Sequence, residues 1–370
     1  MKFLYYTLAF VPVLILLLIY AFRLIMRLTK PLMKLEKKKL WKAVRIALSL
    51  IICAMSFMVF SVPGIISLHF LVLALITDIV MWLVNKVCKL KKESKWNSSW
   101  RYLLPAIATI AFIFYGYWNL NHLVVTEYEL DSQKIDGNGY RIAFLSDVHY
   151  GGIQKKQVLK EKIDEINAKN PDLIILGGDI TEEETSNEEM HEIFEILSGL
   201  KSKYGTYYVY GNHDLQLYRD KEQRSYSWNE YLEALHKAGI TVLDDEAVII
   251  DKDFLLIGRK DLSMGERLSL KDLEAFGRAF ELGGGIKPDY FILEIDHQPN
   301  LEEGKSDLLL SGHTHGGQMW PIGIIMDILG DPTYGEYTKK KHLIVSSGVA
   351  GWGFPFKTAK RSEYLIIDVK

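Results

Sequence analysis

The sequence predicts an α/β domain with layered sheets, preceded by an all-α transmembrane anchor of about four helices. Long apolar runs fill residues 1–120, whereas short apolar runs alternate with helical patterns from residue 121 onward. Polar residues of metal-binding type follow several of the short runs. We therefore expect a multi-pass anchor in residues 1–120 and an α/β domain in residues 121–370.

The expected anchor consists of four apolar segments, at residues 3–20, 46–62, 68–84 and 103–120. Each approaches the ~20 residues that a helix needs to cross a bilayer. The first segment is not expected to be a signal peptide, because it lacks a small-residue cleavage site and most of its positive charge follows the apolar core. We interpret it as a retained helix.

Basic residues predict the orientation of this anchor. Residues 23–45 contain nine Lys and Arg and residues 86–101 contain six, whereas residues 62–68 contain none. Placing both basic loops in the cell's cytoplasm leaves the N-terminus and the C-terminal domain outside it, in the cell membrane's extracytoplasmic space. This expectation reverses if the helix count is wrong by one. Within the third segment, Asp78 is expected to form a structural hydrogen bond rather than a functional site.

Charge divides the chain in the same way. Residues 1–120 hold 16 of the 44 Lys and Arg residues but only 3 of the 46 acids, which leaves the remainder with a net charge of −15. So acidic a domain is not expected to bind nucleic acid, whose partners present basic surfaces. Both cysteines, Cys53 and Cys88, lie in the first part, so the second part has no disulfide.

From residue 121, strands and helices are expected to alternate, which is typical of a layered α/β fold with ligand-bearing loops at the strand ends. Helices are predicted at residues 154–168, 188–200 and 228–238. Strands are predicted at residues 140–145, 173–176, 206–210, 241–243, 247–250, 254–258, 290–293, 308–310, 343–345 and 364–367.

Metal-binding residue types gather just after these predicted strands. Carboxylate, imidazole and amide groups together suit Mn²⁺, Fe or Zn²⁺ better than Ca²⁺, which prefers oxygen ligands. The set is large enough for two ions, with one carboxylate bridging them. A His-x-His pair such as His313 and His315 could by itself be two loop histidines, but here it completes a longer series. The candidates are Asp147, His149, Asp179, Asn212, His213, Asp214, His297, His313 and His315.

In this order the candidates form five blocks: Asp147-Val148-His149, Gly178-Asp179, Gly211-Asn212-His213-Asp214, His297 and Gly312-His313-Thr314-His315. The pattern resembles the calcineurin-like metallophosphoesterases. Within them it is most similar to the membrane-anchored bacterial branch, whose last block reads Gly-His-Thr-His-Gly-Gly-Gln, here residues 312–318. The resemblance implies a calcineurin-like α/β/β/α sandwich.

The resemblance also implies roles for the residues. One ion would be held by Asp147, His149, Asp179 and His315, and the second by Asp179, Asn212, His297 and His313. Mn²⁺ is the first choice for both ions, with Fe or Zn²⁺ as alternatives. His213 would contact the phosphate or protonate the leaving oxygen, with Asp214 orienting its ring.

Two further segments are candidates for contact with the substrate. The apolar residues 319–329 are interpreted either as a lip that enters the bilayer surface or as a buried core helix. A glycine-rich loop at residues 346–357 could cover the metals, so that Lys357 and Arg361 join Asn212 and His213 in binding phosphate. The run Glu182–Glu184 is expected to be an exposed helix start.

The expected function is hydrolysis of a phosphoester or diphosphate bond by a dinuclear metal centre, on a membrane-lipid or envelope-linked phosphate. Monoesters, diesters and diphosphates all fit this chemistry. The alternative is a membrane-anchored scaffold or sensor that keeps the fold without turnover, which the complete ligand set disfavours.

Overall fold

The computed structural model describes residues 2–30, 38–57, 61–88, 99–135, 137–251, 253–273, 290–301, 304–338 and 341–370. The chain divides into two compact units, Met1–Phe114 and Tyr115–Lys370. Helix α4 (Leu103–Leu120) crosses this division, so its last six residues, 115–120, belong to the C-terminal unit.

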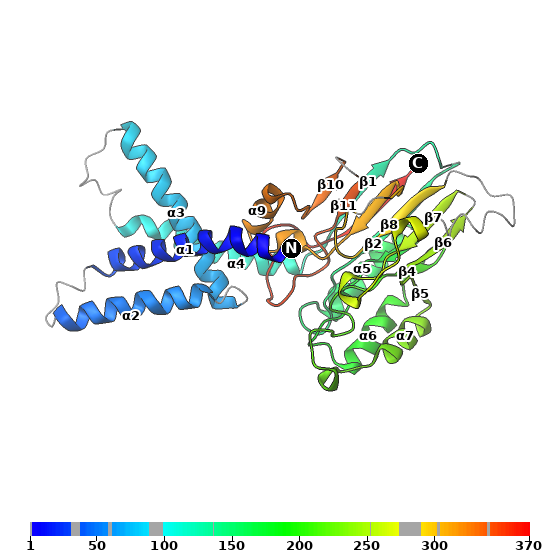
Figure 1. Ribbon diagram of the computed structural model, residues 1–370, viewed down its shortest axis with the longest axis horizontal. Helices are drawn as coiled ribbons and strands as arrows, with labels where there is room; N and C mark the ends of the chain where they lie inside the picture. Colours follow the sequence, from blue (N-terminus) through cyan, green and yellow to red (C-terminus); the bar gives the residue numbers. More distant parts are fainter. Residues whose placement is uncertain are drawn as a thin grey trace. The chain divides into compact units, whose positions relative to one another are not determined.

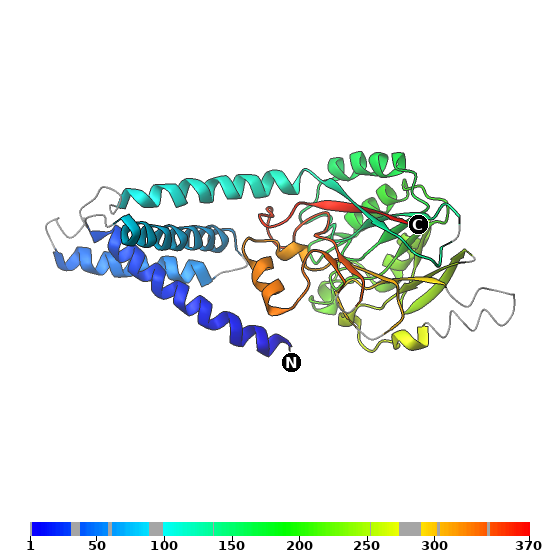
Figure 2. The same ribbon diagram turned by 90° about the horizontal axis from the view of Figure 1, so that it is seen from above.

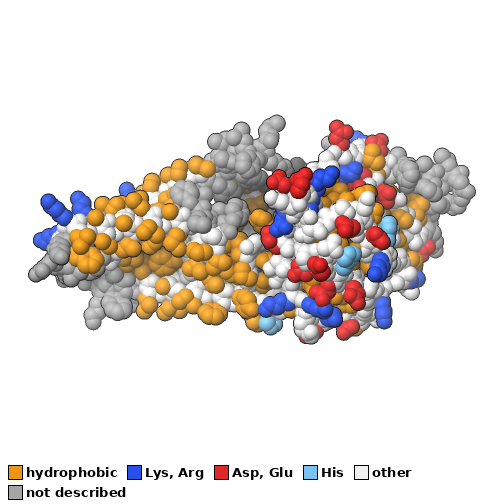
Figure 3. Space-filling model, turned by 90° about the horizontal axis from the view of Figure 1, so that it is seen from below, with side chains coloured by type: hydrophobic (Ala, Val, Ile, Leu, Met, Phe, Trp, Pro, Cys, Tyr) orange, Lys and Arg blue, Asp and Glu red, His pale blue; other side chains and the backbone are white. Residues whose placement is uncertain are grey.

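The N-terminal unit is helical, with α1 (Lys2–Leu28), α2 (Lys38–Phe57), α3 (Val62–Cys88), the 3₁₀ helix η3 (Ser99–Tyr102) and the start of α4 (Figure 1). In the described residues, three helical stretches are long and apolar enough to cross a membrane: Val11–Leu28, Val62–Cys88 and Leu103–Leu120. The remaining expected segment, at residues 46–62, begins in α2 and includes residues 58–60, which are outside the described part. Hydrophobic side chains cover the face of this unit seen in Figure 3.

Asp78 lies at the centre of a polar cluster in this unit. Its carboxylate accepts hydrogen bonds from Tyr20 Oη at 3.0 Å and Tyr102 Oη at 2.9 Å. It also pairs with Arg27 at 3.3 Å and Arg101 at 2.8 Å. The expected hydrogen-bonding role is confirmed, and the cluster ties α3 to α1 and to η3. An acid in an apolar helix is tolerated because these partners satisfy it.

The C-terminal unit contains two six-stranded sheets. The first has the order β1-β12-β2-β3-β4-β5 and the second has the order β10-β11-β9-β8-β7-β6. In the first sheet the strands are β1 (Val124–Leu130), β12 (Glu363–Val369), β2 (Tyr140–Leu145), β3 (Leu173–Leu176), β4 (Thr206–Tyr208) and β5 (Ile240–Val242). In the second they are β10 (Gly335–Tyr337), β11 (Leu343–Val345), β9 (Leu308–Ser311), β8 (Phe291–Ile295), β7 (Phe254–Gly258) and β6 (Glu246–Asp251).

Alternating side chains of the first sheet fill two cores. Ile142 and Phe144 of β2 face the second sheet, whereas Ala143 and Leu145 face helices. Those helices are α5 (Lys156–Ala168), α6 (Asn187–Leu197) and α7 (Trp228–Lys237), which Figure 2 shows along one side of the unit. On the outer face of the second sheet the described residues place Leu270 and Leu273, next to residues 274–289, which are outside the described part. The layers are therefore helices, first sheet and second sheet, and Leu270 and Leu273 pack on the outer face of the second sheet.

Helices α6 and α7 begin at capping boxes. The hydroxyl of Ser186 accepts from the backbone N–H of Glu189, whose carboxylate accepts from the N–H of Ser186. Ser227 and Glu230 repeat the arrangement at α7. Such boxes satisfy backbone donors that a helix start leaves free, so both helices begin at defined residues.

The direction of the strands determines where the candidate site lies. Strands β2, β3 and β4 pair in parallel, as do β7, β8 and β9. The carboxyl ends of parallel strands meet at one edge of a sheet, so the loops after these strands lie together. Short elements complete the unit: η4 (Lys221–Gln223), η5 (Leu262–Met264), η7 (His315–Gly317) and α9 (Ile322–Leu329).

Candidate metal centre

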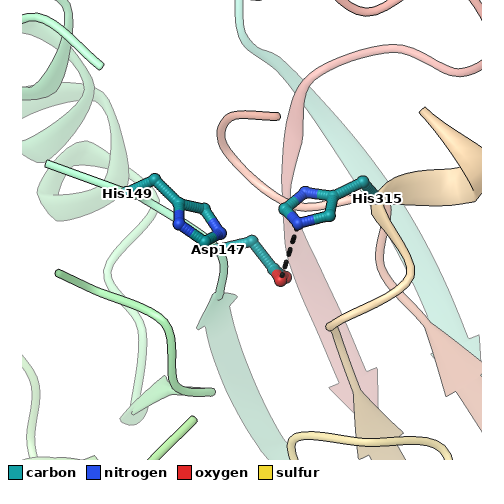
Figure 4. A group of neighbouring side chains, drawn as sticks. All are labelled: Asp147, His149 and His315. Atoms are coloured by element: carbon teal, nitrogen blue, oxygen red, sulfur yellow. Dashed lines mark ion pairs between the residues drawn. The ribbon is translucent and has the colours of Figure 1, made fainter. Parts of the chain in front are cut away.

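The loops after β2 and β9 bring together the first group of metal-binding side chains, Asp147, His149 and His315 (Figure 4). Their ligand atoms lie within 4.8 Å of one another, and all three side chains are buried. Nε2 of His315 is 3.7 Å from Oδ1 of Asp147. The backbone N–H of His313 donates to the same oxygen at 2.9 Å, which locks the two loops together.

The second group, Asp179, His297 and His313, comes from the loops after β3, β8 and β9, with ligand atoms again within 4.8 Å of one another. Nε2 of His297 is 3.0 Å from Oδ2 of Asp179. Nδ1 of His297 lies 2.8 Å from the carbonyl oxygen of Gly177, which fixes the ring against the first sheet. A main-chain contact of this kind is the usual way a metal-binding histidine is oriented.

Asp179, a member of the second group, also lies close to the first group. Its Oδ2 is 3.8 Å from Nε2 of His149 in the first group and 3.0 Å from Nε2 of His297 in the second. The backbone approaches it closely, because a Cβ on Gly211 would lie 2.2 Å from Oδ1 of Asp179. Glycine at position 211 therefore lets the loop after β4 reach the centre.

The chemistry of the buried atoms fits two cations. Buried polar atoms usually have hydrogen-bond partners, so a cluster of buried polar atoms without such partners is consistent with a site that binds an ion. In the described part of the chain, several buried atoms at these groups make no hydrogen bond: Asp147 Oδ2, His149 Nδ1, His149 Nε2, Asp179 Oδ2, Asn212 Oδ1 and His297 Nε2. All of these residues belong to the predicted ligand set.

The backbone at the centre is strained. Among the described residues nine non-glycine residues have positive φ, and five of them are predicted ligands, with φ from 47° to 67°. These five are Asp147, His149, Asp179, His313 and His315. Left-handed backbone is costly for residues with a Cβ and concentrates at functional sites.

Burial and charge set the protonation of the groups. Burial lowers the pKa of His313 to about 4 and that of His315 to about 3, so both imidazoles are neutral at pH 7 and offer a lone pair. Burial opposes ionisation of Asp179, but the nearby His297 outweighs it and lowers the pKa of Asp179 well below its usual value. The central carboxylate is thus ionised at neutral pH.

His213 has a different partner from the expected one. Its Nδ1 lies 2.6 Å from Oε2 of Glu183, and its ring centre lies 5.2 Å from that of Tyr218 and 5.3 Å from that of Trp352. The carboxylate of Asp214 instead accepts backbone N–H groups of Asp179, Ile180, Thr181 and Gly211 and the hydroxyl of Tyr231. The expectation that Asp214 orients His213 is therefore corrected, because these donors already occupy its oxygens.

The two cations expected to bind phosphate lie elsewhere. Lys357 is fully buried, and its Nζ donates to the carbonyl oxygens of Ser347, Gly348 and Ala350. Its ammonium thus tethers the glycine-rich loop instead of facing substrate. The guanidinium of Arg361 lies 5.3 Å from the ring centre of Trp118. Neither side chain lines the cavity at the centre in the described residues.

A cavity of about 760 Å³ opens beside the two groups. Glu182 and Glu183, expected to start an exposed helix, line it instead, and Glu182 is buried with Oε2 3.3 Å from Nδ1 of His149. Their position three and four residues after Asp179, on the same loop, was the signal for this role. The lining consists of Gly152, Ile153, Asp179, Glu182, Glu183, Glu184, Asn212, His213, Tyr218, His313, His315, Trp352 and Gly353.

Known proteins are similar to this chain in sequence. Residues 140–317 match the model of the calcineurin-like phosphoesterase family. An uncharacterized metallophosphoesterase of Helicobacter pylori is 28% identical over 266 residues, covering 70% of this chain and 67% of the relative. One from Aquifex aeolicus is 27% identical over 263 residues, covering 69% and 95%.

A transmembrane protein with metallophosphoesterase domain, from Danio rerio, is 28% identical over 287 residues, covering 72% of this chain and 62% of the relative. These relatives and the three apolar helices indicate membrane association for this chain as well. The family match of residues 140–317, together with the paired metal-binding groups, supports a metal-dependent phosphoesterase domain of the calcineurin-like type.

Proposed function

We propose that this chain hydrolyses a phosphoester or diphosphate bond with two divalent cations, Mn²⁺ first among them. Asp147, His149, Asp179 and His315 would hold one ion, and Asp179, Asn212, His297 and His313 the other. The supporting observation is the pair of three-residue groups, in which Asp179 of the second group also lies close to His149 of the first. When bound, two such ions supply an activated water and stabilise charge on the phosphoryl oxygens.

The chain's own residues complete the reaction. His213 lines the cavity, and its ring centre lies 5.4 Å from that of His149. Because Nδ1 is held by Glu183, Nε2 is the nitrogen that would give a proton to the leaving oxygen. The rings of Tyr218 and Trp352 lie beside the imidazole and form apolar surface around the proposed acid.

The proposed substrate is a membrane-lipid or envelope-linked phosphate. Helix α4 continues without a break from an apolar span into the C-terminal unit, which ties the enzyme to a bilayer. The cavity has room for more than a phosphate group, and Ile153, Tyr218 and Trp352 give it apolar walls. The acidic character of residues 121–370 continues to disfavour nucleic acid.

We place the catalytic domain outside the cytoplasm. The basic residues of 23–45 and of 86–101 can share the cytoplasmic side only if α2 and α3 both cross the membrane between them. Arg45 of α2 is buried against α1, with Nε 3.0 Å from Thr29 Oγ1, which supports α2 as part of the helical bundle. Protease added to intact spheroplasts should cleave the domain, and full protection would reverse the orientation.

Purified full-length protein in detergent provides the test of function. We expect Mn²⁺-dependent hydrolysis of bis(p-nitrophenyl) phosphate and of a short-chain lipid diphosphate, abolished by chelator and restored by added metal. Faster turnover of the lipid would support the substrate assignment. Metal binding without cleavage of either compound would overturn the proposed function.

A further inference from the structure

Helix α9 presents isoleucines to solvent instead of to the core. Among its residues, all of them described, only Gly323 is buried, so the interpretation of this segment as a buried core helix is wrong. Ile324 is 52% exposed and Ile328 is 78% exposed, and their spacing of four residues places them on the same side of the helix. Ile322 is 38% exposed as well, but it lies two residues before Ile324 and so on a different side of the helix.

The one charged side chain of α9, Asp327, is exposed, and hydrogen bonds hold one of its carboxylate oxygens. Oδ1 of Asp327 accepts hydrogen bonds from the hydroxyl of Thr333 at 2.8 Å and from that of Tyr337 at 3.0 Å. The backbone N–H of Thr333 donates to the same oxygen at 3.1 Å. An exposed apolar patch is typical of a surface that contacts a membrane or a partner.

Hydrogen bonds join the start of α9 to the end of α4 within the C-terminal unit. The side-chain amide of Asn119 in α4 donates to the carbonyl oxygens of Lys357 at 2.9 Å and Lys360 at 2.7 Å. Between these two residues, the hydroxyl of Thr358 accepts the backbone N–H of Trp320, two residues before α9. The isoleucines therefore follow a segment that is fixed to the end of an apolar helix.

That end of α4 has the residues of a membrane–water boundary. Tyr115, Tyr117 and Trp118 are between 40% and 48% exposed. The ammonium of Lys155 lies 3.2 Å from the hydroxyl of Tyr117, and Arg361 lies over the ring of Trp118. Aromatic rings with basic neighbours are enriched where a span leaves the bilayer, because the rings suit the headgroup layer and cations suit its phosphates.

We propose that α9 is an interfacial helix whose isoleucines enter the bilayer surface beside the end of α4. A lipid surface is the occupant that these observations favour, because the apolar patch adjoins a helix long and apolar enough to span. The two isoleucines on this side of α9 also make a patch too small for a stable protein interface, which typically buries about 800 Å² on each partner. Shallow insertion of a short apolar face suits them.

The helix is coupled directly to the loop that carries His313 and His315. A Cβ on Gly317 would lie 2.2 Å from Cα of Gly323, so the two backbones touch and both positions require glycine. Seating α9 on a bilayer would thus bring the metal loop close to the lipid headgroups. This consequence for substrate access rests on the proposed function, whereas the membrane contact itself does not.

The test uses the full chain with Cys53 and Cys88 replaced by serine and a single new cysteine, Ile324→Cys, labelled with an environment-sensitive fluorophore. Leu268→Cys is the matched control, because Leu268 is 53% exposed and Ile324 is 52% exposed. Both are reconstituted into vesicles of phosphatidylcholine with a minority of phosphatidylglycerol. Lipids with a spin label near the headgroup then report contact by quenching.

We expect quenching at position 324 several-fold greater than at position 268, together with a blue-shifted emission. Equal, weak quenching at both positions would overturn the proposal. A blue shift at 324 without quenching by lipid would also overturn it, because the helix would then lie against protein, such as a second copy. Chelator-sensitive hydrolysis of bis(p-nitrophenyl) phosphate by the unlabelled wild type in the same vesicles reports separately on the proposed function.

Discussion

Oε2 of Glu183 lies 2.6 Å from Nδ1 of His213, and this contact pairs the loop after β3 with the loop after β4. The carboxylate orients the ring and leaves Nε2 as the nitrogen that would donate a proton to the leaving oxygen. Asp179 lies four residues before Glu183 and Asn212 directly precedes His213, so the same two loops carry predicted metal ligands and the proposed proton donor. Under the proposed function, this pair of loops would set the distance between the metals and the acid.

Replacing Glu183 should impair proton donation in particular. We expect Glu183→Gln to lower kcat about tenfold for an alkyl phosphodiester, less than the ~10²-fold or larger loss expected for His213→Ala, because the ring stays but loses its orientation. A p-nitrophenyl ester, whose leaving group needs no proton, should be affected little.

The control for this experiment is Glu184→Gln, since Glu184 is exposed and pairs with Arg219 at 2.8 Å. Steady-state kinetics with both esters make the comparison. Equal losses with the two leaving groups would argue that Glu183 has only a structural role.

Replacing Asp179 should remove the bridge between the metals. We expect Asp179→Asn to abolish turnover and to reduce bound metal from two ions per chain toward one or none, because a neutral amide cannot attract two cations. Elemental analysis of purified protein after dialysis measures the metal directly. A variant that keeps wild-type activity and metal content would remove Asp179 from the centre.

Asp214 should matter for stability through the loops it holds. Asp214→Asn replaces an acceptor with an amide that cannot accept all the N–H groups of Asp179, Ile180 and Gly211, which lie at 2.7–2.8 Å. We expect a loss of about 2 kcal/mol or more, since buried donors without partners cost about 1–3 kcal/mol each.

Thermal unfolding of the detergent-solubilised variant measures this loss. Asp272→Asn is a control, because Asp272 is exposed and bonds locally to Ser269. An unchanged melting temperature for Asp214→Asn would contradict the structural role.

Lys357 should give stability a dependence on pH. Burial lowers its pKa from 10.5 to about 8 in the folded protein. Below about pH 8 the lysine is charged in both the folded and the unfolded protein. Between about pH 8 and pH 10.5 the unfolded chain binds a proton that the folded chain lacks. Folding therefore becomes more favourable as pH rises through this window.

The difference in melting temperature between wild type and Lys357→Met should consequently grow in favour of the wild type from pH 8 to pH 10.5. Lys360→Met, at a half-buried lysine over the ring of Tyr334, is the matched control. A constant difference across the window would show that the Lys357 ammonium titrates alike in both states.

The strands and the residues at their ends could be predicted from the sequence because buried parallel strands form short apolar runs. The predicted strand at residues 173–176 is observed as β3, and that at residues 140–145 as β2. Strand β1 was not predicted, since its pairing with β12 depends on a partner more than 200 residues away. Its sequence, with three polar residues among seven, carries no buried-strand pattern.

The contacts between loops could not be predicted in the same way. Asp214 follows His213 in sequence, but the turn directs its carboxylate to the backbone of residues 179–181. Glu183 reaches His213 from another loop, 30 residues away. Lys357 has the sequence character of a surface cation, and only the folded loop shows three carbonyl oxygens around its ammonium. Such partners depend on loop geometry, which residue type and spacing do not determine.

The most direct test of the dinuclear centre is low-temperature electron paramagnetic resonance of the purified full-length protein loaded with Mn²⁺. Two ions that share Asp179 would be magnetically coupled, so we predict the spectrum of a spin-coupled pair in the wild type and its loss in Asp179→Asn. A wild-type spectrum of isolated, uncoupled Mn²⁺ ions at full metal loading would contradict a shared centre.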